Sequence, residues 1–299
     1  MGMPRPAAEL LLRESKVRPF SGSVATLGRL HVYFSAAELE SSARKSGVAL
    51  APYEPALHRE PDLARRGFVS DDALLKALGF QSATRIDYSD YEAAEEILDL
   101  NSSETPSQLE RRFDVIIDSG TIEHVFHVPN ALAHLARMLK PGGRIIHLSP
   151  SANCMDHGFY GFSPTFFADY YEENHFDLKS VQVCRFLKPH EQARCDVYDY
   201  TADRGAGLQI GCLDSSVYYV FVVAESTPQS TFGVIPQQSA YRRRWAEEDG
   251  IRSGARKRRI LDWTHRSTLG RNAFDLYRQY LRPVVMKFRR LPMRRIARL

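Results

Sequence analysis

Two histidines and a tyrosine are the side chains of this sequence best placed to accept a proton in a reaction. His124 follows the apolar run at 113–118, and His157 and Tyr160 lie in a short segment rich in glycine and aromatic residues. Side chains of both types can act as general bases beside a reacting hydroxyl or amine. We therefore predict His124, His157 and Tyr160 as catalytic residues. The alternative is structural, because a histidine at a helix start or in a turn also forms hydrogen bonds that only hold the chain.

The sequence gives little support for a metal site, for a serine hydrolase or for a nicotinamide-binding enzyme. His124 and His127 are one helical turn apart, but no H-E-x-x-H pattern surrounds them, and Cys154 with His157 does not complete a zinc-ligand set. We therefore predict no metal site. The chain also lacks the G-x-S-x-G pattern of serine hydrolases and, after its first predicted strand, the G-x-G-x-x-G pattern of nicotinamide-binding enzymes.

A second group of polar residues lies at the ends of predicted strands. Asp87, Asp99 and Asp118 each fall at a carboxyl end, and Gly28 follows an earlier strand. In an open α/β sheet, ligands bind outside the carboxyl ends of the strands. A carboxylate there can accept hydrogen bonds from two ribose hydroxyls, which is the role that we predict for Asp87. One such aspartate alone is more often a helix cap or a turn residue, but three at successive strand ends favour a binding site.

The elements that must position these residues alternate along the chain. Strands are predicted over 23–27, 83–87, 97–100, 113–118, 144–148, 180–184 and 215–224. Helices are predicted over 7–14, 36–46, 73–78, 130–139 and 164–174. Strands separated by helices indicate crossover connections and a parallel sheet. We therefore expect an α/β, Rossmann-like fold with a seven-stranded, mostly parallel sheet and helices on both faces, occupying residues 1–226 with its core at 20–226 and a helical insertion at about 50–80.

The order of motifs over residues 82–150 resembles that of the class I S-adenosylmethionine-dependent methyltransferases. The segments that carry the resemblance are Asp87, Ile97–Asn101, Phe113–Asp118, Glu123–His124 and Leu139–Gly143. The segment that follows, Asp156–Pro164, resembles a bacterial subgroup associated with surface-polysaccharide gene clusters.

The resemblance implies S-adenosyl-L-methionine as the cofactor and a small molecule, a sugar or a glycan precursor as the methyl acceptor. It implies that Asp99 bonds the adenine amine and that Leu100 packs on the adenine ring. The cofactor-binding residues predicted in this way are Thr26, Gly28, Arg29, Asp87, Tyr88, Asp99, Leu100, Asp118 and Ser119. The stretch at 186–214, between the last two predicted strands, is expected to be either a cover for the acceptor or a solvated loop.

The chain departs from the family pattern in its first glycine loop. Only Gly28 stands where the family has several glycines, and Arg29 follows it. A single glycine can still let the backbone approach the methionine end of the cofactor, and Arg29 could face the cofactor carboxylate. The alternative is a non-catalytic methyltransferase-like module that acts as a binding or assembly protein.

Charge is distributed unevenly between the body and the carboxyl-terminal part. Residues 241–299 hold 18 Lys and Arg against 5 Asp and Glu, while the residues before them hold 22 against 31. We expect residues 227–299 to form a basic, partly helical tail that binds an anionic membrane surface or folds back as a helical appendage. Nucleic acid is a less favoured partner, because no recognition motif is present. With no visible signal peptide, membrane span or disulfide framework, we expect a cytoplasmic protein, peripheral at the inner face of the membrane if the tail binds lipid.

Overall fold

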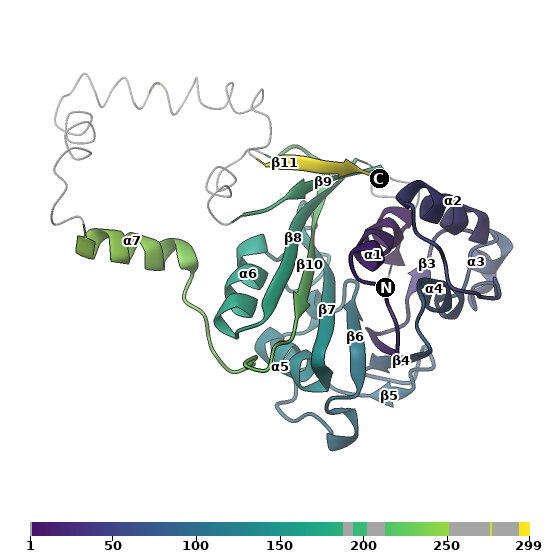
Figure 1. Ribbon diagram of the computed structural model, residues 1–299, viewed down its shortest axis with the longest axis horizontal. Coiled ribbons are helices and arrows are strands. Elements are labelled where there is room, and N and C mark those ends of the chain that lie inside the picture. The colour runs from purple at the N-terminus through teal and green to yellow at the C-terminus, as the bar shows by residue number, and fades with distance from the viewer. Residues whose placement is uncertain (1, 188–193, 202–212, 251–275, 277–292) are drawn as a thin grey trace.

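The structure is a computed structural model, and it describes residues 2–187, 194–201, 213–250, 276 and 293–299 (Figure 1). The strands are β1 (Gly2–Met3), β2 (Ser23–Leu27), β3 (His31–Val32), β4 (Ser82–Asp87), β5 (Glu96–Ile97), β6 (Phe113–Asp118), β7 (Leu139–Ala152), β8 (Asp177–Phe186), β9 (Cys195–Asp199), β10 (Val217–Glu225) and β11 (Arg294–Arg298). The helices are α1 (Arg5–Val17), α2 (Ala36–Ser46), α3 (Pro61–Arg65), α4 (Asp71–Leu78), α5 (Val128–Met138), α6 (Pro164–Glu173) and α7 (Ser239–Gly250), with single 3-10 turns η1 (Ser107–Leu109) and η2 (Ile122–His124).

The central sheet is mixed rather than mostly parallel. Among the described residues it has nine strands in the order β11-β9-β8-β10-β7-β6-β2-β4-β5. Neighbouring strands from β7 to β5 pair in parallel, whereas those from β11 to β7 pair in antiparallel fashion. The predicted α/β fold with a large central sheet is confirmed, but the prediction of seven mainly parallel strands is wrong.

The additional strands lack the apolar pattern that marks a buried strand. β9 lies inside the stretch 186–214, which we expected to be either a cover for the acceptor or a solvated loop, and β11 has arginine at three of its five positions. β11 forms beside β9, where the Arg298 side chain donates hydrogen bonds to both Asp196 oxygens, at 2.7 and 3.2 Å. The end of the predicted basic, partly helical tail is therefore a strand over Arg294–Arg298. The predicted strand at 97–100 is also reduced, since β5 ends at Ile97.

Two apolar clusters fill the space on the two faces of the sheet. Helices α1, α2 and α4 pack in one cluster and helices α5 and α6 in the other, which places them on opposite faces (Figure 1). Along β6, Val115 and Ile117 enter the first cluster, whereas Phe113 and Ile116 enter the second. This explains the nearly continuous apolar run of β6, because a strand covered on both faces needs apolar residues at consecutive positions.

Local sequence signals set the ends of helices α2 and α4. Ser35 and Glu38 form a capping box at the start of α2, and Gly47 ends that helix in the left-handed conformation. At α4 the Ser70 hydroxyl accepts from the Ala73 amide at 3.1 Å, and Gly79 closes the helix. The second helix therefore starts two residues before the predicted helix at 73–78 and stops where predicted, at Leu78, and its first residue, Asp71, becomes buried.

The carboxyl-terminal part is described only in pieces. Helix α7 lies at its start, and its Arg242 pairs with Glu173 of α6. At its end Ile296 packs against the first apolar cluster. The basic run Arg256–Arg259 and the apolar residues Phe288 and Leu291 of the predicted membrane-binding tail lie outside the described residues.

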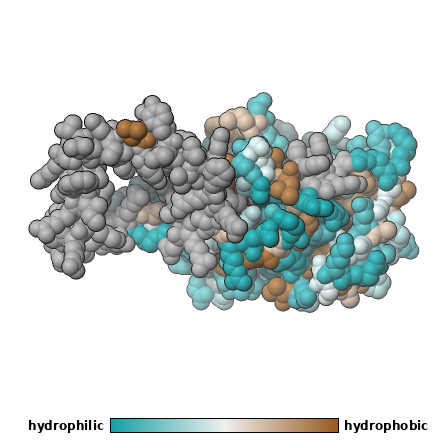
Figure 2. All heavy atoms as spheres, turned by 90° about the horizontal axis from the view of Figure 1, so that it is seen from above, coloured by the Kyte–Doolittle hydropathy of each residue, from teal (hydrophilic) through white to brown (hydrophobic). Residues whose placement is uncertain are grey.

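Within the described ranges, no helix has the length and the apolar character that crossing a bilayer requires. On the face shown in Figure 2, the described part of the surface is mainly hydrophilic, and its hydrophobic residues lie in small separate groups.

Candidate functional site

Two of the predicted carboxylates lie on adjacent strands at the same edge of the sheet. Asp87 ends β4, where it pairs with Ile97 of β5, and Asp99 follows two residues later. Asp87 is half-buried, and its Oδ1 accepts a hydrogen bond from the Tyr88 amide at 2.6 Å. Asp99 is exposed, whereas Leu100 beside it is buried. The structure therefore brings Asp87, Asp99 and Leu100 into one region at the carboxyl ends of these strands.

The Asp99 carboxylate is held in a defined orientation. Its Oδ1 accepts hydrogen bonds from the Asn101 backbone amide at 2.9 Å and from the Asn101 side chain at 3.0 Å. These hydrogen bonds, the backbone one most, lower the pKa of Asp99. The charged form therefore prevails, and Oδ2 remains available to a donor such as an amine.

The glycine turn after β2 is short and internally bonded. The Thr26 hydroxyl donates to the Gly28 carbonyl at 2.7 Å, and the Gly28 amide donates to the Ile86 carbonyl of β4, also at 2.7 Å. Gly28 has a φ of 72°, a conformation that favours glycine. This one glycine thus makes the turn and joins the ends of β2 and β4.

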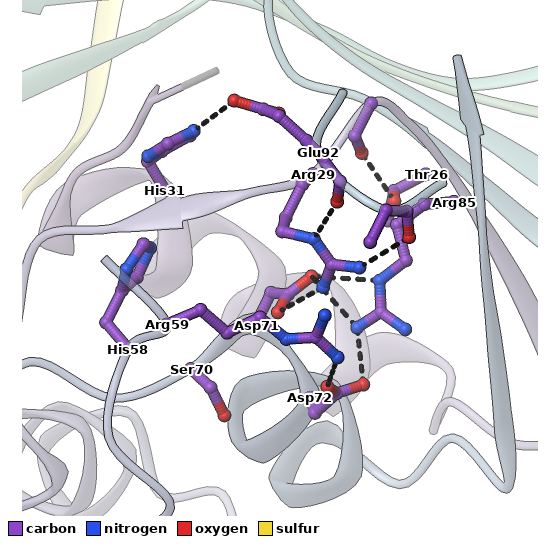
Figure 3. A network of polar contacts seen from close by, with 12 residues as sticks. Thr26, Arg29, His31, His58, Arg59, Ser70, Asp71, Asp72, Arg85 and Glu92 are labelled. Carbon is purple, nitrogen blue, oxygen red and sulfur yellow. Dashed lines mark hydrogen bonds and ion pairs between the residues drawn. The ribbon is translucent and has the colours of Figure 1, made fainter. Parts of the chain in front are cut away.

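Arg29 lies in a buried network of charges (Figure 3). Its guanidinium donates to both oxygens of Asp71, at 3.0 and 3.1 Å, and to the carbonyls of Glu92 and Ala93, at 2.8 and 3.0 Å. Arg85 donates to the same Asp71 at 2.9 Å. The Arg29 side chain therefore anchors the loop that follows Asp87 to helix α4, and its predicted contact with a cofactor carboxylate remains a prediction.

Asp118 and Ser119 are also engaged within the protein. Asp118 is fully buried, and its Oδ2 lies 2.7 Å from Nδ1 of His147, whose Nε2 lies 2.6 Å from the Tyr171 hydroxyl. Asp118 Oδ1 accepts from the Thr121 amide at 3.0 Å. The Ser119 hydroxyl points to the Gly2 carbonyl at 3.4 Å. Asp118 thus orders the end of β6, and our sequence analysis missed its buried partners His147 and Tyr171.

The predicted histidines meet above a buried carboxylate. His157 Nε2 lies 3.5 Å and His124 Nε2 lies 3.9 Å from Oε1 of Glu123, and the two imidazole rings are 5.3 Å apart. The Glu123 side chain is 0% exposed, whereas the His124 and His157 side chains are 49% and 48% exposed. Neither oxygen of the Glu123 carboxylate has a hydrogen-bond partner among the described residues. These three residues, called the Glu–His–His cluster below, can together hold a metal ion.

Burial changes the protonation of this carboxyl group. Removal from water is the main cause that raises the pKa of Glu123 to about 8, and the negative charge of the nearby Asp118 carboxylate is the second cause. Burial is also the main cause that lowers the pKa of His124. An unpartnered buried carboxylate is costly, so this side chain needs a proton or a positive charge beside it near neutral pH. From the sequence, Glu123 is recognisable only as part of the Glu123–His124 motif. Its burial could not be predicted, because burial depends on the fold.

The Glu–His–His cluster depends on close contact between two backbone segments. The amides of Phe159 and Tyr160 donate to the Glu123 carbonyl at 2.8 and 3.2 Å. A Cβ atom on Gly158 would lie 2.8 Å from that carbonyl oxygen and 3.1 Å from His124 Nδ1. Glycine is therefore required at position 158 for the His157 segment to lie on η2.

Exposed aromatic rings adjoin the cluster. Phe126 and Phe159 are 61% and 66% exposed, and their rings meet edge to face at 5.7 Å. The Tyr160 hydroxyl donates to the Phe126 carbonyl at 2.8 Å. The three predicted catalytic residues therefore lie on two neighbouring segments beside a partly apolar surface.

Hydrogen bonds connect this region with the ends of the strands. The Thr121 hydroxyl donates to the Leu27 carbonyl at the end of β2, at 2.8 Å. The His127 amide donates to the Asn101 side chain at 3.0 Å, and the Asn130 side chain donates to the Asn101 carbonyl at 2.6 Å. The segment with Glu123 and His124 is thereby held between the end of β2 and the Asp99–Asn101 turn.

Comparisons with known proteins find one family that matches this chain and several solved structures to which the chain is similar. None of the curated protein sequences matches the chain. A SAM-dependent methyltransferase from Thermotoga maritima, described as a possible histamine N-methyltransferase, is 15% identical with a TM-score of 0.34 and covers 75% of this chain and 91% of its own. The 1,6-didemethyltoxoflavin-N1-methyltransferase of Burkholderia thailandensis, with bound S-adenosylhomocysteine, is 15% identical with a TM-score of 0.38 and covers 75% and 78%. Geranyl diphosphate C-methyltransferase of Streptomyces coelicolor, also with S-adenosylhomocysteine, is 10% identical with a TM-score of 0.34 and covers 74% and 76%.

The family match covers the strand ends and the cluster described above. It extends over residues 31–195, which is more than half of the chain, and its description is "Methyltransferase domain". It contains Asp87, Asp99 and the Glu–His–His cluster, whereas Thr26, Gly28 and Arg29 precede its first residue. The protein therefore belongs to the methyltransferase domain family.

Proposed function

We propose that the protein is an S-adenosylmethionine-dependent methyltransferase that acts in the cytoplasm on a small molecule, a sugar or a glycan precursor. The observation that supports this proposal best is the pair of carboxylates at adjacent strand ends. Asp87 and Asp99 lie at the carboxyl ends of β4 and β5, beside the buried Leu100. This is the edge at which an open α/β sheet binds its ligand, and it lies within the segment that matches the family.

The residues of this edge fit the adenosyl half of the cofactor. Asp87 would accept hydrogen bonds from the two ribose hydroxyls, Asp99 would accept from the adenine amine, and Leu100 would pack on the adenine face. Tyr88, whose side chain is 71% exposed, would cover the adenosyl group from outside. The bound cofactor supplies an electrophilic methyl group, and the protein orients it and excludes water.

The acceptor would bind on the side of the aromatic surface. The exposed rings of Phe126 and Phe159 offer apolar faces on which a sugar or an aromatic ring can stack. His124, His157 and Tyr160 border this surface and are the residues that we propose for contact with the acceptor. A sugar acceptor would agree with the resemblance of Asp156–Pro164 to the polysaccharide-cluster subgroup.

One observation favours a second candidate, a methyltransferase-like module without catalysis. The Arg29 guanidinium donates four hydrogen bonds, to Asp71 and to two backbone carbonyls. The Ser119 hydroxyl is turned to Gly2. The methionine half of the cofactor would then find few free donors at the glycine turn, and the protein would serve as a binding or assembly partner.

Calorimetric titration with S-adenosylhomocysteine distinguishes the two candidates. The proposed function predicts saturable binding to the full chain and weaker binding to the Asp87→Ala variant. Asp90→Ala is the matched control, because Asp90 is an exposed carboxylate of the same loop. Absence of binding to the parent protein would refute the first candidate and favour the module. Equal binding by all three proteins would remove Asp87 from the site.

We also propose that the basic carboxyl-terminal part associates with anionic membrane surfaces. The support for this proposal is the excess of Lys and Arg over Asp and Glu in residues 241–299. Ile296 and Arg298 are not available for it, since Ile296 packs against the body and Arg298 pairs with Asp196.

A further inference from the structure

The Glu–His–His cluster contains three groups whose chemistry suits a transition-metal ion. Glu123 offers a carboxylate oxygen, and His124 and His157 offer imidazole nitrogens, with all three ligand atoms within 4.8 Å of one another. Two imidazoles and one carboxylate are a donor set that binds Zn²⁺, Fe²⁺, Mn²⁺ and similar ions. Mg²⁺ fits less well, because it prefers oxygen ligands.

The distances leave space for an ion and are too long for direct hydrogen bonds. The separations of 3.5 and 3.9 Å from Glu123 Oε1 to the two imidazole nitrogens exceed the normal range of an N–H···O bond. Two ligands that lie about 2.0–2.1 Å from a tetrahedral ion are about 3.3 Å apart. A small movement of the half-exposed histidines would therefore complete the geometry around an ion.

The burial of Glu123 is the independent observation that points to a ligand. Its side chain is 0% exposed, and neither oxygen has a hydrogen-bond partner among the described residues. Native proteins seldom leave a buried carboxylate without a partner. A carboxylate that lies close to two imidazole nitrogens and has no hydrogen-bond partner among the described residues is the arrangement expected of a metal ligand.

The backbone around the cluster is shaped to hold these groups in place. Gly158 allows the His157 segment to pack directly on Glu123 and His124. At Gly120, where φ is 91°, a Cβ atom would lie 3.0 Å from Glu123 Oε1. Glycines on both sides therefore admit the carboxylate into its position, although the side chain gains no hydrogen bond there.

We propose that Glu123, His124 and His157 bind one divalent transition-metal ion, with its remaining coordination positions open to solvent. The half-exposed imidazoles place the ion at the surface, next to the exposed rings of Phe126 and Phe159. Three protein ligands with an open position are typical of sites at which an ion binds a substrate oxygen. The binding site rests on the geometry of the cluster alone. Its use, to bind a hydroxyl or an anionic oxygen of the acceptor, rests on the proposed function.

The test is calorimetric titration of Zn²⁺ into the full-length protein after treatment with a chelator. We expect one ion per chain, and we expect His157→Ala and Glu123→Gln to weaken binding by about tenfold or more, because loss even of a group behind a ligand costs about 10–100-fold. His127→Ala is the matched control, since this exposed histidine is near the cluster in sequence but is not one of its ligands, and it should bind as the parent does. Circular dichroism spectra equal to the parent's show that each variant is folded.

A spectroscopic measurement identifies the ligands without relying on affinity. The parent protein loaded with Co²⁺ should show visible absorption bands of a nitrogen- and oxygen-ligated ion, and the bands should change in His157→Ala but not in His127→Ala. Absence of Zn²⁺ binding, or binding that all variants share, overturns the proposal. If S-adenosylhomocysteine still binds in that case, the methyltransferase proposal stands and only the metal site is wrong.

Discussion

Removal of Asp71 should destabilise the protein severely, because this carboxylate neutralises two buried guanidinium groups. Asp71 accepts hydrogen bonds from Arg29 at 3.0 and 3.1 Å and from Arg85 at 2.9 Å. The side chains of Arg29, Arg85 and Asp71 are 6%, 3% and 3% exposed. Breaking a buried pair leaves an uncompensated charge and costs about 3–5 kcal/mol. We therefore expect Asp71→Ala to lower the free energy of unfolding by about this amount.

A neighbouring carboxylate on the same helix provides the control. Asp72 also pairs with Arg85, but its side chain is 40% exposed, so Asp72→Ala should cost about 1 kcal/mol or less. Equilibrium unfolding in urea, followed by circular dichroism, measures both variants against the parent. The reasoning fails if Asp71→Ala loses no more stability than Asp72→Ala. That result would mean that water or the carbonyls of Glu92 and Ala93 suffice for Arg29.

Four other outcomes can be measured. Asp87→Ala should weaken binding of S-adenosylhomocysteine by about 1–3 kcal/mol, because two ribose hydroxyls lose a charged acceptor; unchanged calorimetric affinity would contradict this role. His157→Ala should lower methyl-transfer turnover more than it lowers that affinity, and a loss of affinity alone would move His157 to the cofactor side. Hydrogen bonding by Arg298 is the main cause that lowers the pKa of Asp196. The ionised Asp196 therefore contributes its full stabilisation above about pH 4, and this stabilisation is lost as the pH falls through the folded-state pKa. Urea unfolding at several acidic pH values should show a weaker pH dependence of stability in Asp196→Asn than in the parent, and an equal dependence would refute the role of Asp196. Neutral replacements across Arg256–Arg259 should reduce co-sedimentation with anionic vesicles and leave β11 in place, because each basic residue near such a surface contributes about 1 kcal/mol; equal sedimentation of variant and parent would argue against membrane binding.

Elements whose signals lie within a few residues could be predicted from the sequence. The helices predicted over residues 36–46 and 73–78 follow from local composition, and the structure confirms both, with the second beginning at Asp71. The apolar strand at 113–118 is likewise recognisable from its own residues. The family could also be predicted, because its motifs are short segments in a fixed order, and the match over 31–195 confirms it.

The arrangement of the sheet and the partners of its charged residues depend on tertiary structure. β9 forms between β8 and β11, and β11 forms at the edge beside β9, although neither has the sequence pattern of a buried strand. Arg29 pairs with the carboxylate of Asp71, 42 residues away in the sequence, and this pairing depends on where helix α4 packs. Glu123 is an ordinary surface residue type, and its burial depends on the segments that the fold packs around it, the His157 segment among them. The residue type fixes which chemical groups a side chain carries. Its burial and its neighbours depend on segments that are far apart in the sequence and meet in the fold, and this environment decides whether the side chain is a cap, an ion-pair partner or a ligand.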